Sequence, residues 1–182
     1  MKKSCLIIFV VVLMLIFGGC GGSSIVIGDV GDIDGGGSGS RQHPFSALDG
    51  IWRITSANGS FSSYDGVHPM TLNENSLINR VVLTYNGENN QGSAGRFTVQ
   101  SYSEYKITGK NGLSSTLVLN NPRLTNVTVS RISSNTFRYT LDSSTITIKY
   151  INNNKLEAIE QGTTYMSGYR CTYNISYTLI RR

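Results

Sequence analysis

Residues 171–179 read CTYNISYTL, and this stretch decides the fold class. Every second residue from Cys171 to Leu179 is apolar or aromatic, and the residues between them are Thr, Asn and Ser. A period of two is typical of a β-strand with one buried and one wet face. The same alternation recurs in residues 81–85, 97–99, 136–141 and 145–150, and we find no convincing amphipathic helix. The sequence therefore predicts an all-β protein.

Turn signals separate these alternating segments. Three Asn-Gly pairs predict hairpin turns, because both residues tolerate positive φ: Asn58-Gly59, Asn86-Gly87 and Asn111-Gly112. A further polar break is expected at Gln161–Thr164. The spacing predicts roughly eight to ten antiparallel strands. Sequential hairpins favour a single up-and-down β-barrel, and a β-sandwich is the alternative.

The N-terminal residues differ sharply in composition from the rest. Two lysines precede an apolar run of twelve residues, Leu6 to Phe17, and Gly18-Gly19-Cys20 follows. A permanent membrane span needs about 20 apolar residues, whereas the apolar core of a secretory signal is about 7–15. We therefore expect residues 1–19 to be a signal peptide. Residues 20–45 are rich in Gly and Ser and are expected to form a flexible tether before a β-barrel domain at 46–182.

The stretch Phe17-Gly18-Gly19-Cys20 resembles the lipobox of bacterial prolipoproteins, with Phe where Leu is usual. The resemblance implies that Cys20 becomes the first residue, carries diacylglycerol on its thiol and receives a fatty acyl group such as palmitate on its amino group. The implied partner is a membrane of the cell envelope. Gly21, in place of Asp, favours the outer membrane over the inner one.

A second resemblance concerns the barrel. Gly50-x-Trp52 at the start of the first strand is similar to the lipocalin first-strand motif, which implies that Trp52 plugs the closed end beneath a basic residue, Arg181. An eight-stranded barrel has a lumen that is either filled by side chains or holds one small ligand. Four aromatic residues are candidates for contacting such a ligand or for packing the core: Tyr139, Tyr150, Tyr173 and Tyr177.

Residues suited to catalysis are sparse. His43 lies in the tether, His68 precedes a proline, and neither belongs to a recognised catalytic motif. Glu157 and Glu160 are the candidate carboxylates of a hydrolase, but three residues apart on a strand they would face opposite sides, and both are expected to be solvated or edge-strand charges. Cys171, the one cysteine of the expected domain, is predicted to be a small buried hydrophobe.

These patterns lead to one main expectation and two alternatives. No metal or cofactor is expected, and the net charge of +5 forms no basic stripe of the kind that binds nucleic acid. We expect a non-enzymatic, membrane-anchored bacterial envelope lipoprotein whose lipocalin-like domain binds a small apolar ligand or an envelope partner. The alternatives are a structural or adhesive envelope protein with a filled barrel, and a carboxylate-dependent hydrolase.

Overall fold

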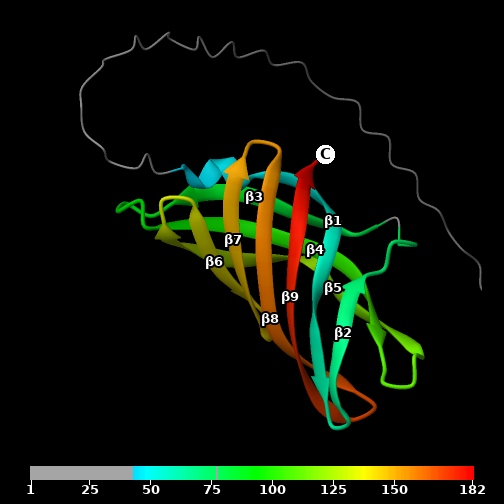
Figure 1. The fold of residues 1–182 in the computed structure, drawn as a ribbon. Helices are drawn as coiled ribbons and strands as arrows, with labels where there is room; N and C mark the ends of the chain where they lie inside the picture. Colours follow the sequence, from blue (N-terminus) through cyan, green and yellow to red (C-terminus); the bar gives the residue numbers. More distant parts are fainter. Residues whose placement is uncertain (1–42, 77) are drawn as a thin grey trace, which may run out of the picture. The chain divides into compact units, whose positions relative to one another are not determined.

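The computed structural model describes residues 43–76 and 78–182, so the predicted signal peptide, Cys20 and the tether up to residue 42 lie outside the described residues. This part of the chain contains one short 3-10 helix and nine strands (Figure 1). They are η1 Phe45–Leu48, β1 Gly50–Ser63, β2 Gly66–Leu72, β3 Arg80–Glu88, β4 Ala94–Thr108, β5 Ser114–Ser133, β6 Thr136–Leu141, β7 Ser144–Asn152, β8 Lys155–Met166 and β9 Tyr169–Arg181. All strand pairs are antiparallel, which confirms the predicted all-β fold.

The strands form one sheet that closes into a ring where β1 pairs with β9, from Trp52↔Arg181 to Ser62↔Thr172. β2 and β3 occupy a single position in this ring, because each pairs antiparallel with both β1 and β4. The loop Asn73–Asn79 separates β2 from β3. Asn79 fixes this loop by donating to the carbonyl of Asn73 and accepting from the backbone N–H of Glu104. With β2 and β3 counted as one strand, the connectivity is up-and-down, as the sequence predicts.

The backbone pairing between β5 and β6 is incomplete. Their pairing runs only from Ser130↔Arg138 to Ser133↔Thr136. Among the described strands, β5 between Ser114 and Val129 therefore pairs with β4 alone. We call this unpaired stretch of β5 the open seam.

Two of the three Asn-Gly predictions are wrong. Asn58-Gly59 lies inside β1, where a Cβ on the glycine would stand 2.2 Å from the carbonyl oxygen of Asn174. Glycine therefore allows β1 and β9 to approach each other closely at this position. Asn86-Gly87 lies in β3 at a register irregularity. Asn111-Gly112 does form the turn between β4 and β5. The break expected at Gln161–Thr164 is also wrong, because β8 runs through it.

One end of the barrel is covered by η1. Trp52 is fully buried there, and its indole N–H donates to the carbonyl of Leu48 at 2.9 Å. The Arg181 guanidinium lies over the indole at 4.3 Å from the ring centroid. Arg181 also donates to the carbonyls of Asp49 and Ala47, at 2.6 and 2.9 Å. We call this the closed end, and Figure 1 shows η1 and the C-terminus at it, opposite the β1–β2 and β8–β9 turns.

Candidate functional site

A pocket of about 290 Å³ lies at the end opposite Trp52, between the turns β1–β2, β4–β5 and β8–β9. We call it the mouth pocket. It is lined by Phe61, Ser63, Tyr64, Asp65, His68, Ile107, Gly109, Leu113, Ser114, Ser115, Met166, Ser167, Tyr169 and Cys171. Its volume is at the lower limit of small-molecule sites, which are about 300–1,000 Å³.

The walls of the mouth pocket are mainly apolar. Phe61 and Ile107 are inward residues of β1 and β4 and are buried, so they give the pocket a dry floor. Tyr64 and Tyr169 stand at its rim with their ring centroids 4.7 Å apart. Tyr64 is 77% exposed and Leu113 is 71% exposed. Large exposed apolar side chains gathered around a pocket are typical of a binding site rather than of a plain surface.

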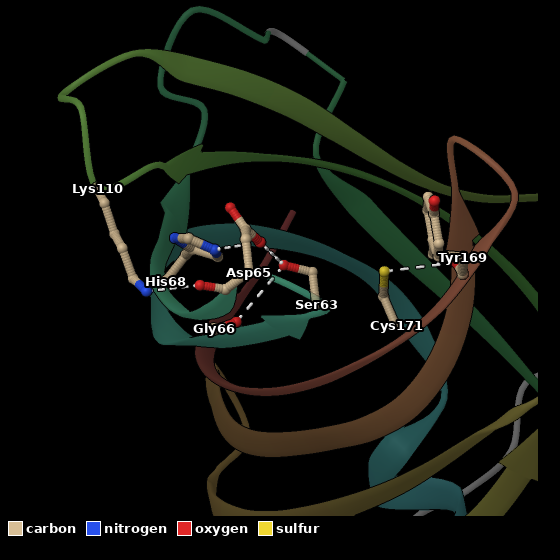
Figure 2. A network of polar contacts seen from close by, with 7 residues as sticks. All are labelled: Ser63, Asp65, Gly66, His68, Lys110, Tyr169 and Cys171. Carbon is tan, nitrogen blue, oxygen red and sulfur yellow. Dashed lines mark hydrogen bonds and ion pairs between the residues drawn. The ribbon is translucent and has the colours of Figure 1, made fainter.

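One wall is polar and is held together by Asp65 (Figure 2). His68 Nε2 lies 3.0 Å from Asp65 Oδ1, and the Ser63 hydroxyl donates to the same oxygen. Lys110 Nζ donates to the Asp65 backbone carbonyl at 2.6 Å. The hydrogen bond from Ser63, and then that from His68, lowers the pKa of Asp65 to about 2. The acid is therefore ionised and orders Ser63 and His68, whereas Lys110 is held by the backbone carbonyl.

This polar wall does not have the order of a nucleophilic relay. In a Ser-His-Asp triad the histidine lies between the hydroxyl and the acid and removes the hydroxyl proton. Here Asp65 lies between Ser63 and His68, so the hydroxyl proton already points at a carboxylate. The buried thiol of Cys171 donates to the carbonyl of Tyr169 rather than to His68, which confirms its predicted burial (Figure 2).

The interior holds a second polar group, which we call the interior cluster: Glu160, Ser144, Tyr105, Tyr173 and Tyr177. The Tyr173 hydroxyl donates to Glu160 Oε1 at 2.9 Å, and the Tyr177 hydroxyl lies 3.4 Å from Oε2. Ser144 Oγ is 3.0 Å from the Tyr173 hydroxyl. Burial raises the pKa of Glu160, and the hydrogen bonds from Tyr173 and Ser144 partly offset this rise.

The expectation that Glu160 is a solvated or edge-strand charge is therefore wrong, because β8 is paired on both sides and Glu160 is half-buried on its inner face. Leu156 and Ala158 point inward from β8, and Glu160 is the next position of the same register. This register was visible in the sequence. Glu157 faces the other side and pairs with Lys155 at 3.0 Å, so the two glutamates do lie on opposite faces, as predicted.

A cavity of about 20 Å³ lies beside Glu160, and the rest of the lumen is packed with apolar and aromatic side chains. Tyr105 lines this cavity and is fully buried, and its hydroxyl has no hydrogen-bond partner among the described residues. Tyr139 and Tyr177 also line it. Burial, followed by the proximity of Glu160, raises the pKa of all three phenols.

The structure brings together three of the four candidate tyrosines. Tyr139, Tyr173 and Tyr177 surround Glu160, whereas Tyr150 lies at the closed end with its ring 4.3 Å from that of His43. Sequence reasoning missed Tyr105 as a site residue. It follows Ser103 and precedes Ile107 on the inward face of β4, so its burial could be expected but its unpaired hydroxyl could not.

Within residues 43–76 and 78–182, no three His, Cys, Asp or Glu side chains lie close enough together to hold a metal ion. In the same residues no helix has the length and apolar character needed to cross a membrane.

Comparisons with known proteins add one structural likeness. No family model matches the chain, and no curated protein matches it. The chain is similar to a solved structure titled "Structure of EF1p2_mFAP2b bound to DFHBI", with 10% sequence identity and a TM-score of 0.36. The match covers 79% of this chain and 98% of that one.

Proposed function

We propose that the protein is a membrane-anchored bacterial envelope lipoprotein that binds a small apolar ligand at the mouth pocket and catalyses no reaction. The observation that carries the proposal is the pocket itself, which joins a dry floor of Phe61 and Ile107 to an exposed aromatic rim. Because the lumen behind it is packed, a ligand would occupy the mouth and not the barrel centre. This restricts the ligand to a compact ring system or to one end of an acyl chain.

The point at which the expected tether joins the barrel follows from the contacts of His43. His43 N donates to the carbonyl of Ser134 in the turn between β5 and β6, and Arg131 donates to the His43 carbonyl. This turn lies at the closed end. A flexible tether of residues 20–42 would have a root-mean-square span of about 24–29 Å. A lipid on Cys20 would thus tether the barrel from the end opposite the mouth pocket.

Ligand binding is tested by titrating the protein with N-phenylnaphthylamine, an apolar dye whose fluorescence rises in dry sites. Ser115→Trp places a large ring in the pocket, and Thr116→Trp places the same ring on the adjacent residue outside it; both positions are exposed. We expect Ser115→Trp to weaken dye binding about tenfold, whereas Thr116→Trp leaves it unchanged. Absence of dye binding to the wild-type protein would refute the proposal.

The anchor is tested separately. Cys20→Ser removes the thiol that would carry the lipid, and we expect the protein to move from the membrane fraction to the soluble fraction. Mass spectrometry of the natively purified wild type should give a chain that begins at a diacylglyceryl Cys20. A chain that retains residues 1–19 would disprove the envelope location, while leaving dye binding as an independent result.

A docked envelope protein is the second candidate, and the rim favours it. Four large side chains are exposed at this end of the barrel: Tyr64 by 77%, Leu113 by 71%, Tyr165 by 73% and Tyr169 by 54%. Together they expose more apolar surface than a small ligand in the pocket would cover. Crosslinking through a photoreactive residue at Tyr165, which does not line the pocket, should capture one defined partner in intact cells. Crosslinks spread over many abundant proteins would count against this candidate.

A further inference from the structure

The mouth pocket carries one ionised acid in a lining that is otherwise mainly apolar. Asp65 is the one acidic residue among the described residues that line it, and none of these residues is Lys or Arg. The hydrogen bonds from Ser63 and His68 lower the pKa of Asp65 to about 2, so the carboxylate is charged at neutral pH. A negative charge therefore stands on one wall, close to the dry floor of Phe61 and Ile107.

The protein's own side chains use one of the two oxygens of this carboxylate. Ser63 and His68 both contact Oδ1, and no side chain in the described part of the chain contacts Oδ2 (Figure 2). The Asp65 side chain is 51% exposed, so the solvent or a ligand can reach it. With Oδ1 engaged, Oδ2 is the oxygen that can accept a hydrogen bond from a ligand in the pocket.

Lys110 lies next to this wall but does not neutralise the acid. Its Nζ donates to the backbone carbonyl of Asp65 at 2.6 Å, and it is not one of the residues that line the pocket. Within residues 43–76 and 78–182 the ion pairs are Asp65–His68 and Lys155–Glu157, so Lys110 forms none with the Asp65 carboxylate. The charge of Asp65 is thus available to a ligand of opposite sign.

The aromatic rim favours the same sign of charge. Tyr64 directly precedes Asp65 in the β1–β2 turn, and its ring centroid lies 4.7 Å from that of Tyr169. Both side chains are exposed. The face of an aromatic ring attracts a cation, because the quadrupole of the ring places negative charge there. The rim and the acid therefore both favour a ligand with a positive head group.

We infer that the ligand of the mouth pocket is an amphiphilic amine in its ammonium form, which donates to Asp65 Oδ2 and lays its apolar body on Phe61 and Ile107. This inference rests on the proposed function of the pocket and names the chemical class of its ligand. The volume of about 290 Å³ limits the apolar body to a short chain or a compact ring system. A carboxylate of the same shape would be repelled by Asp65.

The test is displacement of bound N-phenylnaphthylamine by octylamine, 1-octanol and octanoate at pH 8, where an alkylamine is charged and histidines are ordinarily neutral. The three probes share one chain and differ in the charge of the head group. We expect octylamine to displace the dye at about fivefold lower concentration than octanol, as suits a half-exposed ion pair, and octanoate to be the weakest. Equal potency of octylamine and octanol, or stronger displacement by octanoate, would overturn the inference. Absence of dye binding would instead refute the proposed function, and the inference with it.

Two variants assign the preference to one carboxylate. Asp65→Asn keeps the shape of the side chain and removes its charge, whereas Asp142→Asn removes the same charge from the exposed β6–β7 turn as a matched control. We expect octylamine and octanol to become equal in Asp65→Asn and the fivefold difference to persist in Asp142→Asn, with octanol unchanged in both. For wild type the difference should also shrink in about 1 M sodium chloride, because salt screens an exposed pair of charges. A preference for octylamine that survives Asp65→Asn would contradict the assignment.

Discussion

Gly162 is the residue on which the interior cluster depends most directly. It lies opposite Tyr173 in the β8–β9 register, and a Cβ at this position would stand 2.6 Å from the Tyr173 hydroxyl and 2.7 Å from its Cζ. Glycine in a strand often lets a cross-strand aromatic ring lie over the backbone. Gly162→Ala must therefore displace Tyr173, which loses its hydrogen bonds to Glu160 at 2.9 Å and Ser144 at 3.0 Å.

The magnitude follows from three terms. Overpacking costs about 1–3 kcal/mol, and the two lost hydrogen bonds cost about 1 kcal/mol each. Replacing glycine by alanine also lowers the conformational entropy of the unfolded chain, which stabilises the folded state by about 0.4–1 kcal/mol. We expect Gly162→Ala to lower the free energy of unfolding by about 3 kcal/mol. With a urea m-value of about 2 kcal/mol/M, the midpoint would fall by about 1.5 M.

The matched control is Gly109→Ala, where the nearest atom to the added Cβ is Asn111 Oδ1 at 3.2 Å and no ring is displaced. This variant should unfold within about 0.5 kcal/mol of wild type. Both proteins are compared by urea unfolding, with near-ultraviolet circular dichroism as a report on tyrosine packing. If Gly162→Ala matches Gly109→Ala in midpoint and spectrum, Tyr173 does not lie over β8, and the reasoning fails.

Three further predictions concern other parts of the barrel. Arg181→Ala should lower the free energy of unfolding by about 2–4 kcal/mol in urea, because it removes the stacking on Trp52 and leaves carbonyls at the closed end unpaired. Gly95→Ala should cost about 1–3 kcal/mol in the same assay, because its Cβ would lie 2.8 Å from the Phe45 ring. Asp65 titrates at about 2 in the folded state, below its usual 3.8, so its contribution to stability is present above about pH 4 and is lost as the pH falls through 2. Urea midpoints measured between pH 5 and 2 should accordingly fall less in Asp65→Asn than in wild type.

The alternation of apolar and polar residues was enough to predict the strands. In β9, the inward residues Cys171, Ile175 and Leu179 are at most 1% exposed. This succeeds because the side-chain period of a strand is a local property of the backbone. The up-and-down order also follows from local information, since consecutive hairpins leave few other topologies.

Glycine positions show where local reasoning fails. An Asn-Gly pair in a hairpin turn and one in a strand are identical as sequence, and only the neighbouring strand distinguishes them. Gly59 is required by the closeness of β9, and Gly162 by the ring of Tyr173. Both requirements come from residues more than ten positions away, so no rule based on adjacent residues can find them.

The two polar sites differ in how far the sequence could reveal them. The inward position of Glu160 was readable from the register of Leu156 and Ala158, and it was missed because a glutamate was judged by its type rather than by its position. The Asp65–His68 pair requires the β1–β2 turn to bring two side chains together, and the orphaned hydroxyl of Tyr105 requires knowledge of every neighbour.

The packed lumen explains why the mouth pocket is small. The inward positions of β9 run from Cys171 at the mouth pocket through Tyr173 and Ile175 to Tyr177, so large side chains begin one position below its floor. The Tyr173 ring lies over the inner face of β8, where Gly162 leaves room for it and Glu160 accepts its hydrogen bond. A barrel with small residues at these positions would have a deep cavity. In this chain Tyr173 therefore both donates to the acid inside the barrel and occupies the inward position of β9 that follows Cys171.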